Sequence, residues 1–286
     1  MSDTDDPDRP RPIVKRRPRQ RSGTAAPAGA RPAGTASAAQ APARARKAPV
    51  PKAARPRRKG GLIWKLMLFA LLFPVVWVLV YRFVPIPGTS LMVLRAIDGA
   101  TIQRSPKAID EISPNLIRAV IAAEDSRFCL HDGFEWEAMK AAWEANQQGR
   151  RLRGASTISQ QTAKNVFLWP QRSYVRKAME VPFTVLIETL WPKRRIMEAY
   201  LNVAEWGDGI FGAEAAAQHH FGKSARSLTT REAARLAAVL PSPRRWSASN
   251  PSSRVARRAA RIERSARIVR NSGLDACIRG EKVPGS

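Results

Sequence analysis

The stretch EDSRFCLHDG at residues 124–133, with GASTISQQ at 154–161 and RKAME at 176–180, holds the groups around which the chain is organised. Two carboxylates far apart in the sequence, Glu124 and Glu180, bracket a turn rich in Gly, Ser, Thr and Gln and a set of cations. A carboxylate can accept a proton, and cations with hydrogen-bond donors can stabilise a departing phosphate. The pattern therefore suits a reaction in which one group is deprotonated while an anionic group leaves.

The residues before Glu124 predict a helix. Ser113 suits the N-cap and Pro114 the first helical position, and Ile117, Val120 and Glu124 follow at i, i+3 and i+7. This spacing places Glu124 at the end of the helix and on its apolar face. A carboxylate in such a place is costly unless it is paired or functional.

Helical patterns dominate the rest of the chain after the apolar run described below. We predict helices over about 134–148, from Ser156 or Thr157 onward, and over about 173–190, 192–204, 213–218, 229–240 and 253–271. Residues 89–112 are mixed, and the apolar residues from Leu91 to Ile97 are compatible with an extended segment. The sequence therefore predicts a mainly α domain.

The amino-terminal part is strongly basic. The chain has 286 residues and a formal charge of +26, and its first 60 residues carry 16 Lys and Arg against four Asp. Residues 1–59 have almost no large apolar side chain, so we expect a disordered basic tail. Such a charge balance fits three partner classes, namely nucleic acid, an anionic membrane surface or an acidic substrate.

The apolar run LIWKLMLFALLFPVVWVLVYRFV at residues 62–84 favours the membrane among these partners. A helix of this length spans roughly 34 Å, about the thickness of a bilayer core. The run is too long for a cleaved signal peptide, and no small-residue cleavage site follows it. The basic cluster from Arg55 to Lys59 predicts that the amino end is cytoplasmic and that the chain after Val84 lies outside.

This topology gives a predicted domain plan and predicted partners. We expect a cytoplasmic tail (1–59), a transmembrane helix (60–84), a main domain (85–252) and a C-terminal basic helix and tail (253–286). The tail is expected to touch anionic lipid head groups, and nucleic acid is not an expected partner of the main domain.

The chain has two cysteines, Cys129 and Cys277, which excludes a framework of several disulfides. One bridge could form if the domain lies in an oxidising compartment. The favoured interpretation is that Cys129 is a small buried thiol without a partner.

Five motifs in series resemble the peptidoglycan glycosyltransferases that polymerise lipid II, and among these the monofunctional biosynthetic transglycosylases. They cover about residues 90–250 and read Glu124-Asp125-x-x-Phe128-x-x-His131-x-Gly133, Gly154–Gln161 with Lys164-Asn165, Arg176-Lys177-x-x-Glu180, Arg194–Asn202, and Gly207–Gly212 with Phe221-Gly222-Lys223. The resemblance implies a lysozyme-like glycosyltransferase fold. Neither Ser-x-x-Lys nor Lys-Thr-Gly occurs in the chain, so no penicillin-binding transpeptidase site is expected.

The resemblance also implies roles for particular residues. Glu124 would accept the proton of the sugar 4-hydroxyl of lipid II as this oxygen attacks the growing strand. Glu180 would assist the departing polyprenyl pyrophosphate, or hold a metal or a cation in place. The implied substrate-binding residues are Lys164, Arg172, Arg176, Ser156, Thr157, Gln160, Gln161 and Asn165. The ligands of a metal are unknown, and a divalent cation, Mg or Mn, is a candidate cofactor. Implied partners are lipid II, the glycan strand, the inner membrane and cell-division or elongation proteins, with the catalytic domain in the periplasm.

Structural alternatives compete with these roles. The charged residues Lys164, Arg172, Arg176 and Glu180 could form a salt-bridged helix face. The residues of the Ser/Thr/Gln turn could cap a helix, and we expect capping and substrate binding together. For His131 and Asn202 we expect buried hydrogen bonding.

Two rival functions also remain open. A lysozyme-like hydrolase or lytic transglycosylase would use Glu124 as an acid with a raised pKa. A non-catalytic membrane scaffold of cell-wall assembly would need no buried carboxylate.

Overall fold

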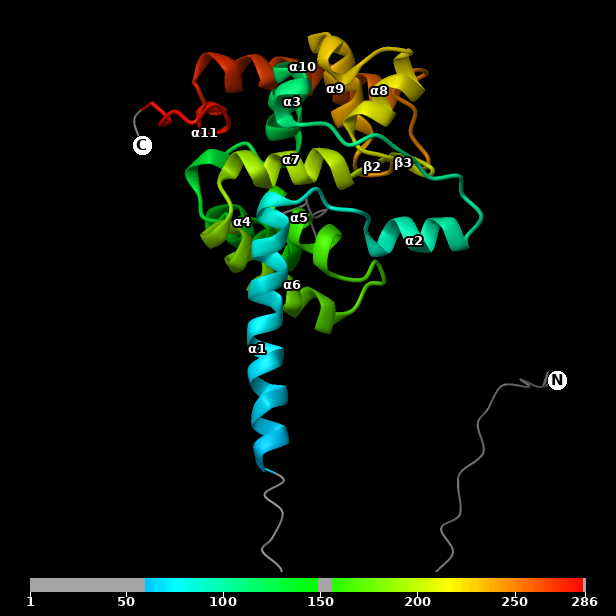
Figure 1. The fold of residues 1–286 in the computed structure, drawn as a ribbon. Coiled ribbons are helices and arrows are strands. Elements are labelled where there is room, and N and C mark those ends of the chain that lie inside the picture. The colour runs from blue at the N-terminus through cyan, green and yellow to red at the C-terminus, as the bar shows by residue number, and fades with distance from the viewer. Residues whose placement is uncertain (1–59, 149–155, 285–286) are drawn as a thin grey trace, which may run out of the picture. The chain divides into compact units, whose positions relative to one another are not determined.

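The computed structural model describes residues 60–148 and 156–284, and these are mainly helical (Figure 1). The predicted tail at 1–59 lies outside the described residues. The helices are α1 (Gly60–Phe83), α2 (Ser90–Ile97), α3 (Pro114–Glu124), α4 (Trp136–Gln147), α5 (Ile158–Phe167), α6 (Tyr174–Leu190), α7 (Lys193–Val203), α8 (Ala213–Phe221), α9 (Thr230–Val239), α10 (Ser253–Asn271) and α11 (Ala276–Arg279), with short 3-10 turns at Ile109–Glu111, Phe128–Leu130 and Ala225–Ser227. The expected mainly α fold is confirmed.

Helix α1 is long and apolar enough to cross a membrane, and most of its side chains are exposed. Its C-terminal half packs against α6, where the ring of Trp77 lies 6.2 Å from that of Phe183, and the same ring lies 5.2 Å from that of Phe167 at the end of α5. Trp191 Nε1 donates to the Val78 carbonyl at 2.8 Å, and the Arg195 guanidinium donates to the Tyr81 carbonyl at 2.7 Å. The end of the apolar helix is therefore bound to the helical domain by backbone contacts and aromatic packing.

Residues 90–97 form helix α2, so the extended segment considered for this stretch is wrong. Thr89 is the N-cap, and its hydroxyl accepts from the Met92 backbone N–H at 3.3 Å. Met92 is buried while Val93 and Ile97 are exposed, so the apolar residues of this stretch do not all mark one buried face. The cap decides the conformation here, because it satisfies a donor that the first helical turn leaves unpaired.

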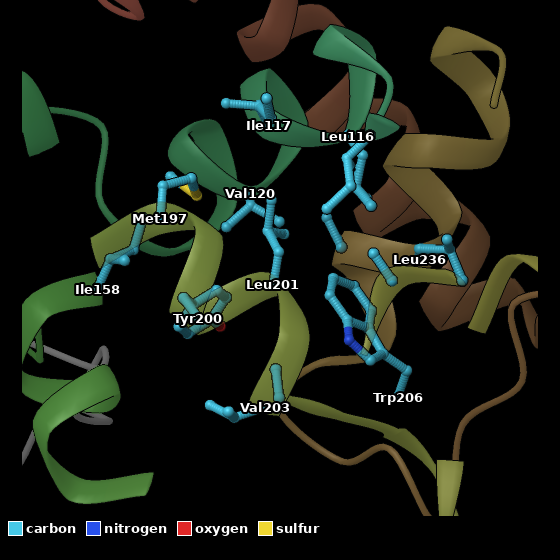
Figure 2. Packing of buried hydrophobic residues seen from close by; sticks show 14 of the residues in the cluster. Leu116, Ile117, Val120, Ile158, Met197, Tyr200, Leu201, Val203, Trp206 and Leu236 are labelled. Atoms are coloured by element: carbon cyan, nitrogen blue, oxygen red, sulfur yellow. The ribbon is translucent and has the colours of Figure 1, made fainter. Parts of the chain in front are cut away.

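The core lies where α7 passes between two groups of helices. Helix α3 packs with α9 and α10, while α5 packs with α6 and α7. Tyr200 and Leu201 of α7 are almost fully buried, next to Val120 of α3 and Ile158 of α5 in Figure 2. A small sheet in the order β1-β3-β2 closes the domain beside α8, with strands Gln103–Arg104, Ile210–Phe211 and Glu205–Gly207. The glycines of the fifth motif, Gly207 and Gly209, thus lie at the turn that joins β2 to β3.

Helix α10 has the limits that the sequence predicts, Ser253–Asn271. Its stripe of Val255, Ala259, Ile262, Ala266 and Val269 is buried against α9 and α3. The helix therefore shares the core of the preceding helices. The domain boundary predicted between residues 252 and 253 stays a prediction.

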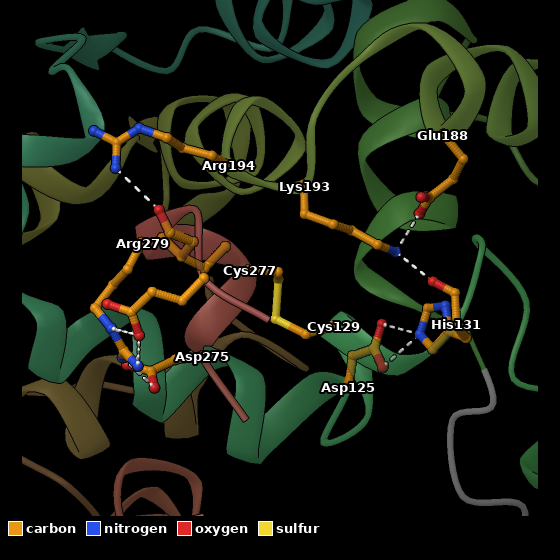
Figure 3. Close-up of a disulfide and its surroundings, with 11 residues drawn as sticks. Asp125, Cys129, His131, Glu188, Lys193, Arg194, Asp275, Cys277 and Arg279 are labelled. Carbon is orange, nitrogen blue, oxygen red and sulfur yellow. Dashed lines mark hydrogen bonds and ion pairs between the residues drawn. A yellow bond between two sulfur atoms is a disulfide. The ribbon is translucent and has the colours of Figure 1, made fainter. Parts of the chain in front are cut away.

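Cys129 and Cys277 form a disulfide, so the favoured interpretation of Cys129 as an unpaired buried thiol is wrong (Figure 3). The bond joins the 3-10 turn at Phe128–Leu130 to α11, across 148 residues of sequence. Asp275 strengthens this attachment, because its carboxylate pairs with Arg118 of α3 and with Arg279, both at 2.7 Å. Only the return of the chain along α10 brings the two cysteines together, and the sequence spacing does not reveal it.

Candidate active site

Glu124 is the last residue of α3, as its spacing predicted, and its side chain is 16% exposed. Two groups contact its carboxylate. Gln161 of α5 donates from Nε2 to Oε2 at 3.0 Å, and Arg258 of α10 lies 3.4 Å from Oε1. The carboxylate is thus held in place by one neutral donor and one cation, and it keeps access to solvent.

Helix α5 begins with a capping box that fixes the position of Gln161. The Thr157 hydroxyl accepts from the Gln160 N–H at 3.2 Å, and Gln160 Oε1 accepts from the Thr157 N–H at 3.0 Å. Both residues are buried, so the structural alternative predicted for them is confirmed, and a substrate contact stays a prediction. Gln161 is further oriented by Tyr200, whose hydroxyl donates to Gln161 Oε1 at 3.3 Å.

Asp125 connects the end of α3 to the start of α5. Its Oδ2 accepts from the Ile158 N–H at 2.9 Å, and His131 Nε2 lies 2.9 Å from its Oδ1 (Figure 3). The other ring nitrogen of His131, Nδ1, accepts from the Gly133 N–H at 3.0 Å. The expected buried hydrogen bonding of His131 is confirmed.

Gly133 brings two backbone segments close together. It has a φ of +90°, and a Cβ at this position would lie 2.8 Å from Thr184 Cγ2. Its carbonyl accepts from the Thr157 hydroxyl at 2.7 Å. The glycine of the first motif therefore helps to set the position of the α5 N-terminus, and only a residue without a Cβ fits there.

Asn202 of α7 is also buried and fully hydrogen bonded, as expected. Its Oδ1 accepts from the Lys107 N–H at 2.9 Å, and its Nδ2 donates to the carbonyls of Lys107 and Glu198 at 2.8 and 2.9 Å. This side chain fixes the segment before α3 against α7.

Lys164 lies on α5, three residues after Gln161, and is partly buried. Among residues 60–148 and 156–284, no group lies within hydrogen-bond or ion-pair distance of its ammonium. The side chains of Ser156 and Asn165 likewise make no such contact within the described part of the chain. These three side chains therefore have no competing partner among the described residues and are free to bind a substrate.

Glu180 is buried on α6 between two cations. The Arg176 guanidinium forms an ion pair with one oxygen, and Lys177 Nζ lies 2.6 Å from the other. Arg176 is fixed further by a bond from Nε to the Gln171 carbonyl at 2.9 Å. Arg172 is exposed and makes no ion pair with any described residue. The structural alternative, a salt-bridged helix face, thus describes Arg176 and Glu180 but neither Lys164 nor Arg172.

Electrostatic interactions connect the two carboxylates through Lys164. Burial raises the pKa of the Glu124 carboxyl above its ordinary value, opposed by the Gln161 hydrogen bond and the charges of Arg258 and Lys164. Burial lowers the pKa of the Lys164 ammonium, and the charge of Glu180 opposes this. Lys164 therefore lies within electrostatic reach of both Glu124 and Glu180.

Two residues of the site were missed by the sequence analysis. Arg258 lies in the C-terminal segment that was assigned to a separate part, and only the fold brings it to Glu124. Tyr200 was noted in the fourth motif without a role. Burial, followed by the negative charge of Glu124, raises its pKa well above the ordinary value, so it stays a neutral hydrogen-bond donor.

The fold and the site together define a class of enzyme. A helical domain on an apolar helix presents a partly buried carboxylate with a raised pKa to a group of cations. A carboxylate of this kind suits proton transfer, and an unpaired cation beside it suits a substrate that carries negative charge. This is the arrangement of an acid–base enzyme that acts on an anionic substrate.

A family model described as Transglycosylase matches residues 91–267, and the chain belongs to this family. The chain is 60% identical over 199 residues to a biosynthetic peptidoglycan transglycosylase of Rhodospirillum centenum, covering 69% of this chain and 86% of the relative. It is 54% identical over 217 residues to the protein of the same name from Caulobacter vibrioides, covering 76% of this chain and 95% of the relative. The family predicted from the five motifs is confirmed.

Proposed function

We propose that this protein polymerises lipid II into the glycan strands of peptidoglycan. The observation that carries the proposal is the position of Lys164, a cation without a partner among the described residues and within electrostatic reach of both Glu124 and the Glu180 cluster. A proton acceptor and a site for a leaving phosphate thus lie side by side. The names of the relatives, biosynthetic peptidoglycan transglycosylase, support the same reaction.

Glu124 is the general base of this reaction. Its carboxylate takes the proton of the sugar 4-hydroxyl of lipid II, and the hydroxyl oxygen attacks the anomeric carbon of the strand's last sugar. The bond from that carbon to the polyprenyl pyrophosphate breaks, so an α-linked donor gives a β-1,4 product with inverted configuration. A raised pKa makes the Glu124 carboxylate a stronger base than an ordinary glutamate.

The departing pyrophosphate is stabilised by cations of α5 and α6. Lys164 has no competing partner among the described residues, and Arg172 is exposed at the start of α6, so both can turn toward phosphate oxygens. Arg176 is already paired with Glu180, so we assign Glu180 the task of holding Arg176 and Lys177 in place. Ser156 and Asn165 add neutral donors beside the same helix. Thr157 and Gln160 act through the helix cap and Gln161 through its bond to Glu124, and direct contacts of these three residues with substrate stay predictions.

The described residues do not fit a resident divalent cation. No group of three or more His, Cys, Asp or Glu side chains lies close enough to hold a metal within residues 60–148 and 156–284. The Glu180 carboxylate, which was one candidate ligand, is occupied by two cationic side chains. The expected Mg or Mn therefore stays a prediction, and none of the steps above depends on it.

We further propose that α1 spans the inner membrane with the catalytic domain in the periplasm. The basic cluster before α1 favours a cytoplasmic amino end. The Cys129–Cys277 disulfide supports an oxidising compartment for the rest of the chain, because such bonds are rare in the cytosol. Proteins of cell division or elongation stay predicted partners.

Incubation of the full chain with purified lipid II in detergent tests the proposed function. We expect glycan polymer and released polyprenyl pyrophosphate. The rival hydrolase predicts cleavage of finished, phosphate-free strands and no polymer. The raised pKa of Glu124 suits that rival too, but the unpaired Lys164 does not, since a neutral glycan needs no such cation. A scaffold would give neither product.

A further inference from the structure

Helix α10 presents a row of arginines to solvent on the side away from its buried stripe. Arg254, Arg257, Arg261 and Arg264 are all exposed, and we call these four residues the arginine row. Their spacing of three, four and three residues places them along one face of the helix. From Arg254 to Arg264 the helix rises about 15 Å.

The charges of the arginine row are not neutralised within the described part of the chain. None of the four has a hydrogen-bond or ion-pair partner among residues 60–148 and 156–284. Glu263, the one acidic residue of α10, pairs instead with Arg267 at 2.9 Å. Like charges at i, i+3 and i, i+4 destabilise a helix by roughly 0.2–0.5 kcal/mol per pair. An anionic partner would relieve this repulsion, so the arginine row favours binding of such a partner.

The helix that carries the arginine row also reaches the candidate active site. Arg258, the neighbour of Arg257 on the same helix, contacts the Glu124 carboxylate. Helix α10 packs on α3, the helix that ends at Glu124, whereas α1 packs on α6. In Figure 1, α10 lies at the end of the helical domain opposite to the one from which α1 leaves. Helix α10 therefore reaches the site through Arg258, and the arginine row lies on the solvent side of the same helix, at the end of the domain opposite to α1.

We propose that the arginine row binds the carboxylates of the peptide branches on the newly made glycan strand. This inference rests on the proposed function, because it takes the product of that reaction as the ligand. The relatives' name, peptidoglycan transglycosylase, denotes a glycan that carries peptides, and a peptide ends in a carboxylate. A row of cations along a helix complements a strand with such branches. An anionic lipid surface is disfavoured by the position of α10 relative to α1.

The test compares the full chain with the variant R254Q/R257Q/R261Q/R264Q. Glutamine keeps the helix propensity of arginine and removes four charges. The control R226Q/R231Q/R245Q/K282Q removes four exposed charges from other elements. Binding is measured with purified glycan strands that keep their peptides and with the same strands after the peptides are removed. Circular dichroism confirms the fold, and R257Q/R261Q is a milder variant.

We expect wild type and the control to bind peptide-bearing strands equally, and the four-arginine variant to bind them about tenfold more weakly, since exposed ion pairs contribute modestly. R257Q/R261Q should be intermediate, and peptide-free strands should bind equally weakly to all. The preference for peptide-bearing strands should shrink as salt rises.

Equal binding of both strand types by wild type, or unchanged binding by the four-arginine variant, overturns the inference. Loss of binding to phosphatidylglycerol vesicles without any change in strand binding would assign the row to lipid instead. The strands are supplied ready made, so this result is separate from the polymerisation assay. If wild type makes no polymer from lipid II, the proposed function is contradicted, whereas the measured binding of strands by the arginine row still stands.

Discussion

The Gln161 side-chain amide donates to the Glu124 carboxylate at 3.0 Å, joining two helices that are 37 residues apart in sequence. A neutral donor keeps the carboxylate oriented and compensates only part of the desolvation that raises its pKa. Tyr200 holds the other end of the amide. The base is therefore positioned by the neutral pair of Gln161 and Tyr200 together with the Arg258 guanidinium.

Replacement of Glu124 by Gln should remove catalysis without harming the fold. A general base contributes about 10²–10⁴-fold, so we expect at least a 100-fold lower rate of polymerisation with lipid II binding retained. The folded pKa is raised, so the contribution of Glu124 to stability is full below its unfolded pKa and is lost as pH rises through the folded value. The melting temperature of the variant at pH 7 should therefore equal or exceed that of wild type. Near-normal turnover would remove Glu124 from the mechanism.

Arg258 should set the acid limb of the pH–rate profile. Its charge favours the ionised form of Glu124, so Arg258→Gln raises the pKa of that carboxyl further. We expect the acid limb of kcat/KM to move to higher pH. The loss of rate in this variant should therefore be larger within the acid limb than at a pH well above it. Arg270→Gln, on the same helix, is the matched control. An unchanged limb in the Arg258 variant would contradict this role.

Lys164 should matter for chemistry more than for folding. Its ammonium has no partner among the described residues, so Lys164→Ala should leave the melting temperature near that of wild type. Loss of a preorganised charged donor typically lowers turnover by about 10²–10³-fold, and we expect such a loss in lipid II polymerisation. Lys282→Ala serves as the control. The hydrolase interpretation would replace ours if wild type and Lys164→Ala cleaved phosphate-free strands equally well.

The disulfide should stabilise the C-terminal end of the domain. Removal of a native disulfide typically costs about 2–5 kcal/mol, so a reductant should lower the melting temperature of wild type. The variant C129S/C277S should melt at the lower temperature with and without reductant. If reductant shifts the variant as much as wild type, the effect does not come from this bond.

The orientation of the chain can be tested with reporters. The basic cluster before α1 predicts that a reporter fused after Ser286 is active only when it folds outside the cytoplasm. An alkaline phosphatase fusion should therefore be active and a green fluorescent protein fusion dark. An inactive alkaline phosphatase fusion together with a fluorescent green fluorescent protein fusion would contradict the orientation.

Local signals in the sequence predict the helices well and the contacts between them poorly. The Thr157 cap and the limits of α10 follow from neighbouring residues, so periodicity and capping rules reveal them. The contact of Arg258 with Glu124 spans 134 residues and depends on how α10 packs against α3. The Cys129–Cys277 disulfide likewise depends on the long-range path of the chain along α10. Helix α2 was missed because apolar residues occupy both its buried and its exposed sides, which blurs the periodic signal.

The attachment of α1 to α6 and α7 has a consequence for how the enzyme meets its substrate. Trp191 and Arg195 bind carbonyls near the end of α1, so the catalytic domain is not tethered through a loose linker. If α1 spans the bilayer, the site is held at a fixed height and tilt above the membrane plane. A lipid-borne substrate then needs only lateral diffusion to reach it, and the collision frequency depends on surface density in the leaflet. Removing the Trp191 and Arg195 contacts would release the domain from α1 and trade this two-dimensional search for a partly three-dimensional one, at a lower effective concentration.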